Sequence, residues 1–301
     1  MRRALCTLLA NTMTAPSYDT KGDLLSRRLN EIAERAPGVA RTARLYAAIL
    51  PLLNEAEPDA VPVFLSPDVA REKLERGQYL LQDLDVEIDV PSVADLLLRL
   101  AAAAETAGEN VAASRVRIWL DERQDDLGAV LQEVLEGQGR LPAREAERMG
   151  MDTDLFRALA QNALKPHLRA WGRRVTPPSA GRSWKRGTCF VCGALPVFGE
   201  LQGNGQALHL RCGLCGADWE HSRLACVHCG NDDHRSREYL FHEGRHELAH
   251  VEACARCRSY LKIIPAFSPT PVDMLPVEDL ATLRLDSCAR EQGYRRTGDA
   301  A

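Results

Sequence analysis

Eight of the ten cysteines stand in four Cys-x-x-Cys pairs, and this pattern is the part of the sequence that could do chemistry. Two intervening residues let both sulfurs of one tight turn face a single metal ion. Each pair is therefore a knuckle that supplies half of a four-thiolate site, while Cys6 and Cys288 lie outside the pairs. The candidate metal ligands are Cys189, Cys192, Cys212, Cys215, Cys226, Cys229, Cys254 and Cys257.

The spacing between the knuckles predicts which of them share an ion. Nineteen residues separate the first knuckle from the second, 24 separate the third from the fourth, and only ten separate the second from the third. Each longer gap accommodates a β-hairpin that brings its two knuckles face to face. We therefore expect two four-cysteine sites, made by the first knuckle with the second and the third with the fourth. Tetrahedral thiolate ligands suit zinc and mononuclear iron alike, so the ligands leave the metal open.

The residue that follows each knuckle bears on how the turn closes. Gly193, Gly216 and Gly230 follow the first three knuckles, and Arg258 follows the fourth. Glycine adopts positive φ without steric cost, which lets backbone N–H groups turn toward the sulfurs. Arg258 removes no ligand, but we expect it to strain the fourth turn.

Three other functions use similar residues. A thiol-redox enzyme needs a Cys-x-x-Cys that opens a helix after a strand, whereas the glycines and strand-like runs here are typical of metal ribbons. The run His242-Glu243-Gly244-Arg245-His246 matches the H-E-x-x-H motif of zinc proteases, but that motif needs a helix and this one contains a glycine between strand-like runs. We expect a turn there, an exposed loop position for His228 inside the third knuckle, and no catalytic residue.

The charge balance bears on the third function, that of a zinc-ribbon protein that binds nucleic acid. The chain has a formal net charge of −4. Residues 182–262 carry eleven Lys or Arg and nine Asp or Glu, which gives +2, and two four-thiolate sites with divalent ions, of −2 each, change that to −2. Such a region has no basic stripe for a phosphate backbone, so we expect no nucleic-acid partner.

The chain also gives expectations about location. No apolar run approaches the roughly 20 residues that span a bilayer, so we expect no membrane insertion. The first ten residues contain an apolar stretch of only seven and no A-x-A-like cleavage site. We expect a frayed tail there, with Met13 as an alternative start, and a cytoplasmic protein, in which disulfides are rare.

The elements that must position the knuckles follow from periodicity, and they predict an α+β protein. Residues 19–174 carry apolar side chains at helical spacing and are expected to form an all-α domain. Ser66 and Pro67 open one of its helices and Gly77 ends it, a capping box at Ser92 opens the next, and Pro51 should kink or break an earlier one.

The composition changes after a linker-like stretch at residues 173–181, from helical patterns to segments rich in Cys, Gly and His with short strand-like runs. Residues 184–221 and 222–264 are expected to form two small rubredoxin-like, zinc-ribbon-like β domains, with strands around residues 207–210 and 238–241. Residues 265–301 are expected to form a C-terminal helix, from about Val277 to Arg290, and a tail.

The order of these motifs resembles the FdhE family of formate dehydrogenase accessory proteins. A helical half precedes C-x-x-C-G-A-L-P-V, then C-x-x-C-G-x-x-W, two further pairs, Y-L-K and D-L-A-T-L-x-L-D. Arg258 and the divergent N-terminal half depart from the family pattern. The matching segments are Cys189–Leu201, Cys212–Trp219, Cys226–Cys229, Cys254–Ile264 and Asp279–Asp286.

The resemblance implies several properties that the residues alone do not. It implies a cytoplasmic protein with two rubredoxin-like sites that bind two iron ions, with zinc as the alternative metal, and with all eight paired cysteines as ligands. It implies a chaperone-like partner of the catalytic subunit of a formate dehydrogenase, needed for that subunit's maturation. No catalytic residue carries over from the family.

Overall fold

The computed structural model describes residues 3–6, 21–56, 63–84, 86–108, 113–137, 139–177, 180–242 and 249–296. They group into two compact units. The helical unit comprises Leu25–Phe64 and Asp85–Arg174, and the sheet unit comprises Met1–Leu24, Leu65–Leu84 and Val175–Ala301. The chain therefore leaves the helical unit at residue 65 and returns to it at residue 85.

The helical unit is built from amphipathic helices around a leucine-rich core. Helix α2 packs on α4, α4 on α5, and α5 on α6. Leu97, Leu100 and Leu131 are fully buried in its interior. Its helices are α1 (Lys21–Arg35), whose first turn belongs to the sheet unit, the 3-10 turn η1 (Pro37–Val39), α2 (Ala40–Glu55), α4 (Val90–Thr106), α5 (Ala113–Leu135), α6 (Arg140–Met149) and α7 (Thr153–Val175).

The predicted helix signals are confirmed in one place and corrected in two. Ser66 caps α3 (Pro67–Glu75), where its hydroxyl accepts from the Val69 N–H at 3.3 Å. Helix α4 begins earlier than the capping box predicted, because Asp89 is the cap and accepts from the Ser92 N–H at 3.2 Å. Helix α2 runs through Pro51 as one helix, so of the expected kink or break at this proline the break is wrong and the kink stays a prediction.

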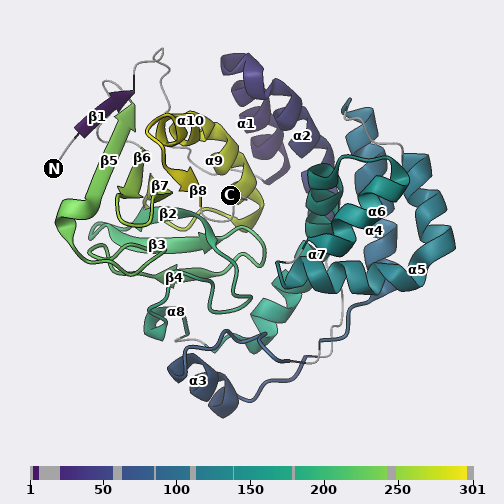
Figure 1. The fold of residues 1–301 in the computed structure, drawn as a ribbon, viewed down its shortest axis with the longest axis horizontal. Helices are drawn as coiled ribbons and strands as arrows, with labels where there is room; N and C mark the ends of the chain where they lie inside the picture. Colours follow the sequence, from purple (N-terminus) through teal and green to yellow (C-terminus); the bar gives the residue numbers. More distant parts are fainter. Residues whose placement is uncertain are drawn as a thin grey trace. The chain divides into compact units, whose positions relative to one another are not determined.

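Strands of the sheet unit form one eight-stranded sheet (Figure 1). Its order is β1-β5-β6-β7-β2-β3-β4, with β8 also paired to β7. The strands are β1 (Arg3–Cys6), β2 (Pro196–Gln202), β3 (Ala207–Cys212), β4 (Asp218–Glu220), β5 (Arg237–His242), β6 (His250–Cys254), β7 (Ser259–Ala266) and β8 (Arg295–Arg296).

Two antiparallel ribbons make up this sheet, as the sequence predicted, but they are joined. The first ribbon is β2-β3-β4 and the second is β5-β6-β7. Parallel pairing of β2 with β7, in which Gly199 lies opposite Ile263, connects them. The frayed tail expected at the N-terminus is wrong for residues 3–6, because β1 pairs in parallel with β5.

Short helices surround the sheet, and α10 packs against β5 and β6 (Figure 1). The single C-terminal helix expected from the sequence is two helices, because the Thr282 hydroxyl donates to the carbonyls of Glu278 at 2.8 Å and Asp279 at 3.1 Å between them. The helical segments of this unit are α3, α8 (Ala180–Ser183), η2 (His234–Ser236), η3 (Val272–Met274), α9 (Leu275–Ala281) and α10 (Leu283–Glu291).

None of the helices in the described ranges has the length and apolar character of a membrane span. The α+β class and the order of helical region, cysteine-bearing sheet and final helices are as predicted. The domain boundaries 19–174, 184–221, 222–264 and 265–301 stay predictions about folding units, since compact grouping of residues does not measure independent folding.

Candidate metal centres

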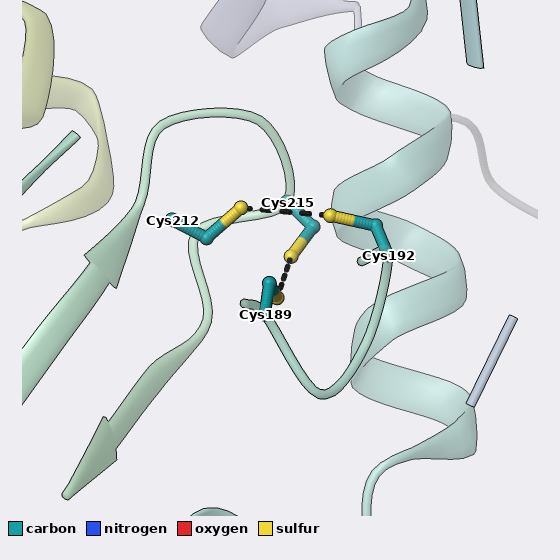
Figure 2. Close-up of side chains that lie close together, drawn as sticks. All are labelled: Cys189, Cys192, Cys212 and Cys215. Carbon is teal, nitrogen blue, oxygen red and sulfur yellow. Dashed lines mark hydrogen bonds between the residues drawn. The ribbon is translucent and has the colours of Figure 1, made fainter. Parts of the chain in front are cut away.

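The first two knuckles meet at one point, which we call site 1 (Figure 2). Cys189 and Cys192 lie in the loop before β2, and Cys212 ends β3 with Cys215 in the turn that follows. The Cys189 and Cys215 sulfurs are 3.5 Å apart, and those of Cys192 and Cys212 are 3.6 Å apart. Figure 2 shows all four sulfurs pointing toward one another.

The third and fourth knuckles meet in the same way at site 2. Cys226 and Cys229 come from the loop after β4, and Cys254 ends β6 with Cys257 in the next turn. The Cys226 and Cys257 sulfurs are 3.8 Å apart, and those of Cys229 and Cys254 are 3.9 Å apart. The structure thus groups the knuckles in the sequential pairs that their spacing predicted.

These separations fit a tetrahedral metal site. Sulfurs about 2.3 Å from a central ion define a tetrahedron with edges of about 3.8 Å, close to the observed values. They are far longer than a disulfide bond of about 2.05 Å. Each cluster can therefore hold one ion with four thiolates, although the ligand roles of the eight cysteines stay a prediction.

The backbone of each knuckle closes the same turn. The residue after the second cysteine donates its N–H to the carbonyl of the first, at 2.9 Å for Gly193, 3.1 Å for Gly216, 2.8 Å for Gly230 and 2.8 Å for Arg258. All four have positive φ, between 58° and 79°. The positive φ of Arg258 agrees with the strain expected there, since a side chain at positive φ crowds its own backbone.

Arg258 makes contacts that offset this strain. Its guanidinium lies 4.3 Å from the centre of the Tyr294 ring. It also donates to the carbonyls of Gln292 at 2.9 Å and Gly293 at 3.0 Å. The fourth knuckle is thereby tied to the chain segment between α10 and β8.

The electrostatics of both clusters call for a cation. At site 1, burial raises the pKa of the Cys189 thiol, while hydrogen bonds from Cys189, Cys192 and Cys215 hold the pKa of Cys212 well below its usual value. At site 2, burial raises the pKa of Cys226 to about 12. Burial also acts to raise the pKa of Cys254, but hydrogen bonds from backbone N–H groups of Cys257 and Arg256 outweigh it and leave a pKa of about 7. A divalent ion in either cluster would favour the thiolate form of thiols whose pKa burial raises, such as Cys189 and Cys226.

Site 1 is enclosed by residues that the sequence placed in the helical domain. We call residues 77–84 the strap. The Leu80 N–H donates to the Phe190 carbonyl at 2.8 Å, and the Leu81 N–H donates to the Val191 carbonyl at 2.9 Å. A Cβ added to Gly193 would lie 2.8 Å from the Tyr79 ring. The strap therefore binds the interior of the first knuckle, a role that nothing in its own sequence pattern indicated.

Site 2 is more open. Cys229 is exposed and Cys257 is partly exposed, whereas three of the four cysteines at site 1 are buried. His228 contacts the Tyr260 carbonyl through its Nε2 at 3.1 Å, so it is a partly buried residue that braces the knuckle, and the exposed loop position expected for it is wrong. Of the H-E-x-x-H run, only the backbone of His242 lies within the described residues.

A buried ion network lies beside site 2. The Lys262 ammonium contacts Asp286 at 2.7 Å and Asp279 at 2.6 Å, and the Tyr260 hydroxyl donates to Asp286 at 2.7 Å. Arg296 binds Asp279 at 2.8 Å and the Val197 carbonyl of the first ribbon at 2.6 Å. The sequence motifs include Tyr260, Lys262, Asp279 and Asp286 without indicating what they do, and the structure shows that with Arg296 they join both ribbons to the tail.

Each cluster has the ligand set of a closed metal site. Four protein ligands close a metal's coordination sphere and leave no position for a substrate. Each of the four knuckles is a turn in a loop or after a strand, and none opens a helix as a redox Cys-x-x-Cys does. Cys288, outside the knuckles, is disulfide-bonded and is buried in one cluster with Leu240 and Tyr260.

Comparison with known proteins finds one family. Residues 224–301 match the model described as FdhE, C-terminal domain. The FdhE homolog of Pseudomonas aeruginosa is 27% identical over 299 residues, which cover 91% of this chain and 88% of that protein. The FdhE homolog of Aquifex aeolicus is 30% identical over 148 residues, and that of Stutzerimonas stutzeri is 38% identical over 111 residues. These two matches span 51% and 35% of the relatives' lengths.

A solved structure has the same fold. The crystal structure of the FdhE protein from Pseudomonas aeruginosa matches with a TM-score of 0.57 and 24% identity. The match covers 93% of this chain and 96% of that one. The family resemblance stated from the motifs is confirmed.

Proposed function

This chain carries the C-terminal domain of the FdhE family and is related to FdhE proteins along most of its length, and from that premise we propose that it is an accessory protein of a formate dehydrogenase. In this proposal it binds the enzyme's catalytic subunit in the cytoplasm and is needed for that subunit's maturation. It holds two iron ions, one in each four-cysteine cluster, and is not itself an enzyme.

The observation that carries the proposal is the pair of closed four-cysteine clusters on one sheet. A client protein needs a shaped surface, and a small ribbon keeps its shape through its metal. The loop at residues 232–235 is exposed and follows the third knuckle, and the β2–β3 hairpin at residues 203–206 is exposed at the end of the two strands that lies away from site 1. Phe267, which is 80% exposed, lies beside that hairpin, where its carbonyl accepts from the Gly203 N–H at 3.1 Å.

The test is a deletion strain that lacks this protein. Formate-dependent dye reduction should fall in that strain and return with the wild-type chain. It should not return with Cys192→Ser or Cys257→Ser. Gly38→Ala is the matched control, because no described atom lies within 4 Å of the added methyl group, and it should restore activity fully.

A binding measurement completes this test. The purified catalytic subunit should bind the metal-loaded chain in titration calorimetry and should bind either cysteine variant more weakly. Unchanged activity in the deletion strain, together with no binding, would show that the proposed function is wrong.

Different experiments determine which metal is bound and what role it has. Elemental analysis and a visible spectrum of protein purified without oxygen distinguish iron from zinc, since ferric four-thiolate sites are coloured and zinc sites are not. Zinc substitution keeps tetrahedral geometry but removes redox chemistry. Rescue of the deletion strain by a zinc-loaded chain would make the metal structural, and failure of that form would make it redox-active.

A further inference from the structure

We propose that the two sites release their metal ions at different rates. Site 2 is open at Cys229 and gives up its ion to chelating ligands from solvent, whereas the strap covers site 1 and slows release. The inference rests on the proposed metal binding of both clusters. The ligand class for site 2 is a multidentate nitrogen or thiolate donor, whether a small chelator or a protein thiol.

Ligand accessibility sets the first contrast. A competing ligand reaches a closed four-coordinate ion as one protein thiolate leaves, so an exposed sulfur is the natural point of entry. Cys229 is exposed at site 2. At site 1 Cys189, Cys212 and Cys215 are buried and Cys192 is only partly exposed.

The glycines after the knuckles give an independent measure of the space around each turn. A Cβ built on Gly193 would lie 2.8 Å from the Tyr79 ring, and one on Gly216 would lie 2.7 Å from the Val272 side chain. Both site 1 turns are therefore covered. At Gly230, the equivalent position in site 2, no described atom lies within 4 Å of the built Cβ.

The cover over site 1 is held by hydrogen bonds rather than by contact alone. Leu80 and Leu81 bond through their N–H groups to the two residues inside the first knuckle, and the Leu80 side chain is fully buried. Phe190 packs edge-to-face on Trp219 at 6.4 Å between ring centres on the inner side of that knuckle. Opening site 1 to a ligand therefore requires the strap to detach. At site 2 Gly187 lies against the Val227 carbonyl inside the third knuckle, but this contact leaves Cys229 exposed.

The experiment follows metal release from protein loaded with two zinc ions, the loading being verified by elemental analysis. Excess 4-(2-pyridylazo)resorcinol reports released zinc by absorbance. We expect two phases of equal amplitude whose rates differ by roughly tenfold or more, which corresponds to a barrier difference of about 1.4 kcal/mol. Alkylation with N-ethylmaleimide after the fast phase, followed by peptide mapping, should label the four cysteines of site 2 and spare those of site 1.

Variants of Tyr79 test whether the strap is what slows metal release from site 1. Tyr79→Ala removes the ring over Gly193 and should speed the slow phase several-fold while leaving the fast phase unchanged. Tyr79→Phe keeps the ring over Gly193, so its slow phase should stay slower than that of Tyr79→Ala.

Release in a single phase from the fully loaded protein, or alkylation of site 1 first, would overturn the inference while leaving two metal sites. Failure to load two zinc ions would refute the proposed sites themselves, and the inference with them.

Discussion

At the scale of single residues, the turn after a knuckle decides how well each metal ligand is held. The sequence predicted how the eight paired cysteines gather and that the residue after each knuckle is the sensitive point of its turn, because both follow from local rules of spacing and backbone sterics. It did not identify what contacts those turns. Tyr79 lies more than one hundred residues before Gly193 in the chain, and no local rule pairs two such positions.

Arg258 offers a test of the strain at the fourth turn. Arg258→Gly and Arg258→Ala both lose the guanidinium contacts to Gln292, Gly293 and Tyr294. They differ in the cost of positive φ, so the glycine variant should be more stable than the alanine variant by about 1 kcal/mol. Chemical denaturation of the zinc-loaded protein measures the difference.

The control for that comparison is the reverse change at the equivalent turn. Gly230→Ala meets no described atom within 4 Å and should cost about the same 1 kcal/mol, from backbone strain alone. Equal stabilities of the two Arg258 variants would mean that the turn relaxes without strain.

At the scale of elements, the buried ion network fixes α10 against β7. Lys262 and Asp286 are each 1% exposed, so their charges are removed from water and depend on each other. Breaking such a pair leaves an uncompensated buried charge, which costs about 3–5 kcal/mol, whereas replacing both partners with apolar groups costs much less. The network also supports the pairing of β8 with β7, because Arg296 of β8 binds Asp279 of α9.

This predicts a specific pattern of stabilities. Lys262→Met should destabilise the zinc-loaded protein by about 3 kcal/mol, because buried Asp286 keeps its charge and is left with only Arg296, 3.9 Å away, as a cation. Lys262→Met combined with Asp286→Leu should recover a large part of that loss, since Asp279 keeps Arg296 as its partner. Denaturant midpoints of the single and double variants measure both effects. A double variant that is less stable than Lys262→Met would show that hydrogen bonds to Asp286, including the one from Tyr260, outweigh the ion pair.

The elements also show where sequence reasoning reached its limit. Strand runs near residues 207–210 and 238–241 fall within β3 and β5, because alternation and flanking glycines are local signals. The parallel pairing of β2 with β7 joins residues about sixty positions apart, and no turn motif in the sequence predicts it. Two ribbons were therefore predictable, whereas their union into one sheet was not.

At the scale of the whole molecule, the order of the helices along the chain does not predict which unit each belongs to. Helix α3 lies between α2 and α4 in the sequence and has the same pattern of helical spacing. Yet residues 65–84, which contain α3 and the strap, belong to the sheet unit. Periodicity identifies a helix but not the surface on which its apolar face packs. The helical spacing of residues 19–174 therefore assigned α3 to the helical domain.

Metal removal should therefore change the hydrogen-exchange protection of a helix according to the unit it belongs to and not according to its position in the sequence. Stripping both ions with a chelator should destabilise the sheet unit, because small ribbons draw much of their folding energy from the metal. Backbone amides of α3, α9 and α10 should then exchange with deuterium much faster, while those of α2, α4, α5 and α6 stay protected by their own leucine-rich core. Hydrogen exchange read by mass spectrometry measures this peptide by peptide, and reloading with zinc should restore protection as the control. Lasting protection of α3 in the stripped protein would show that this helix is held without the metal sites, and loss of protection in α4 and α5 would show that the two units fold as one.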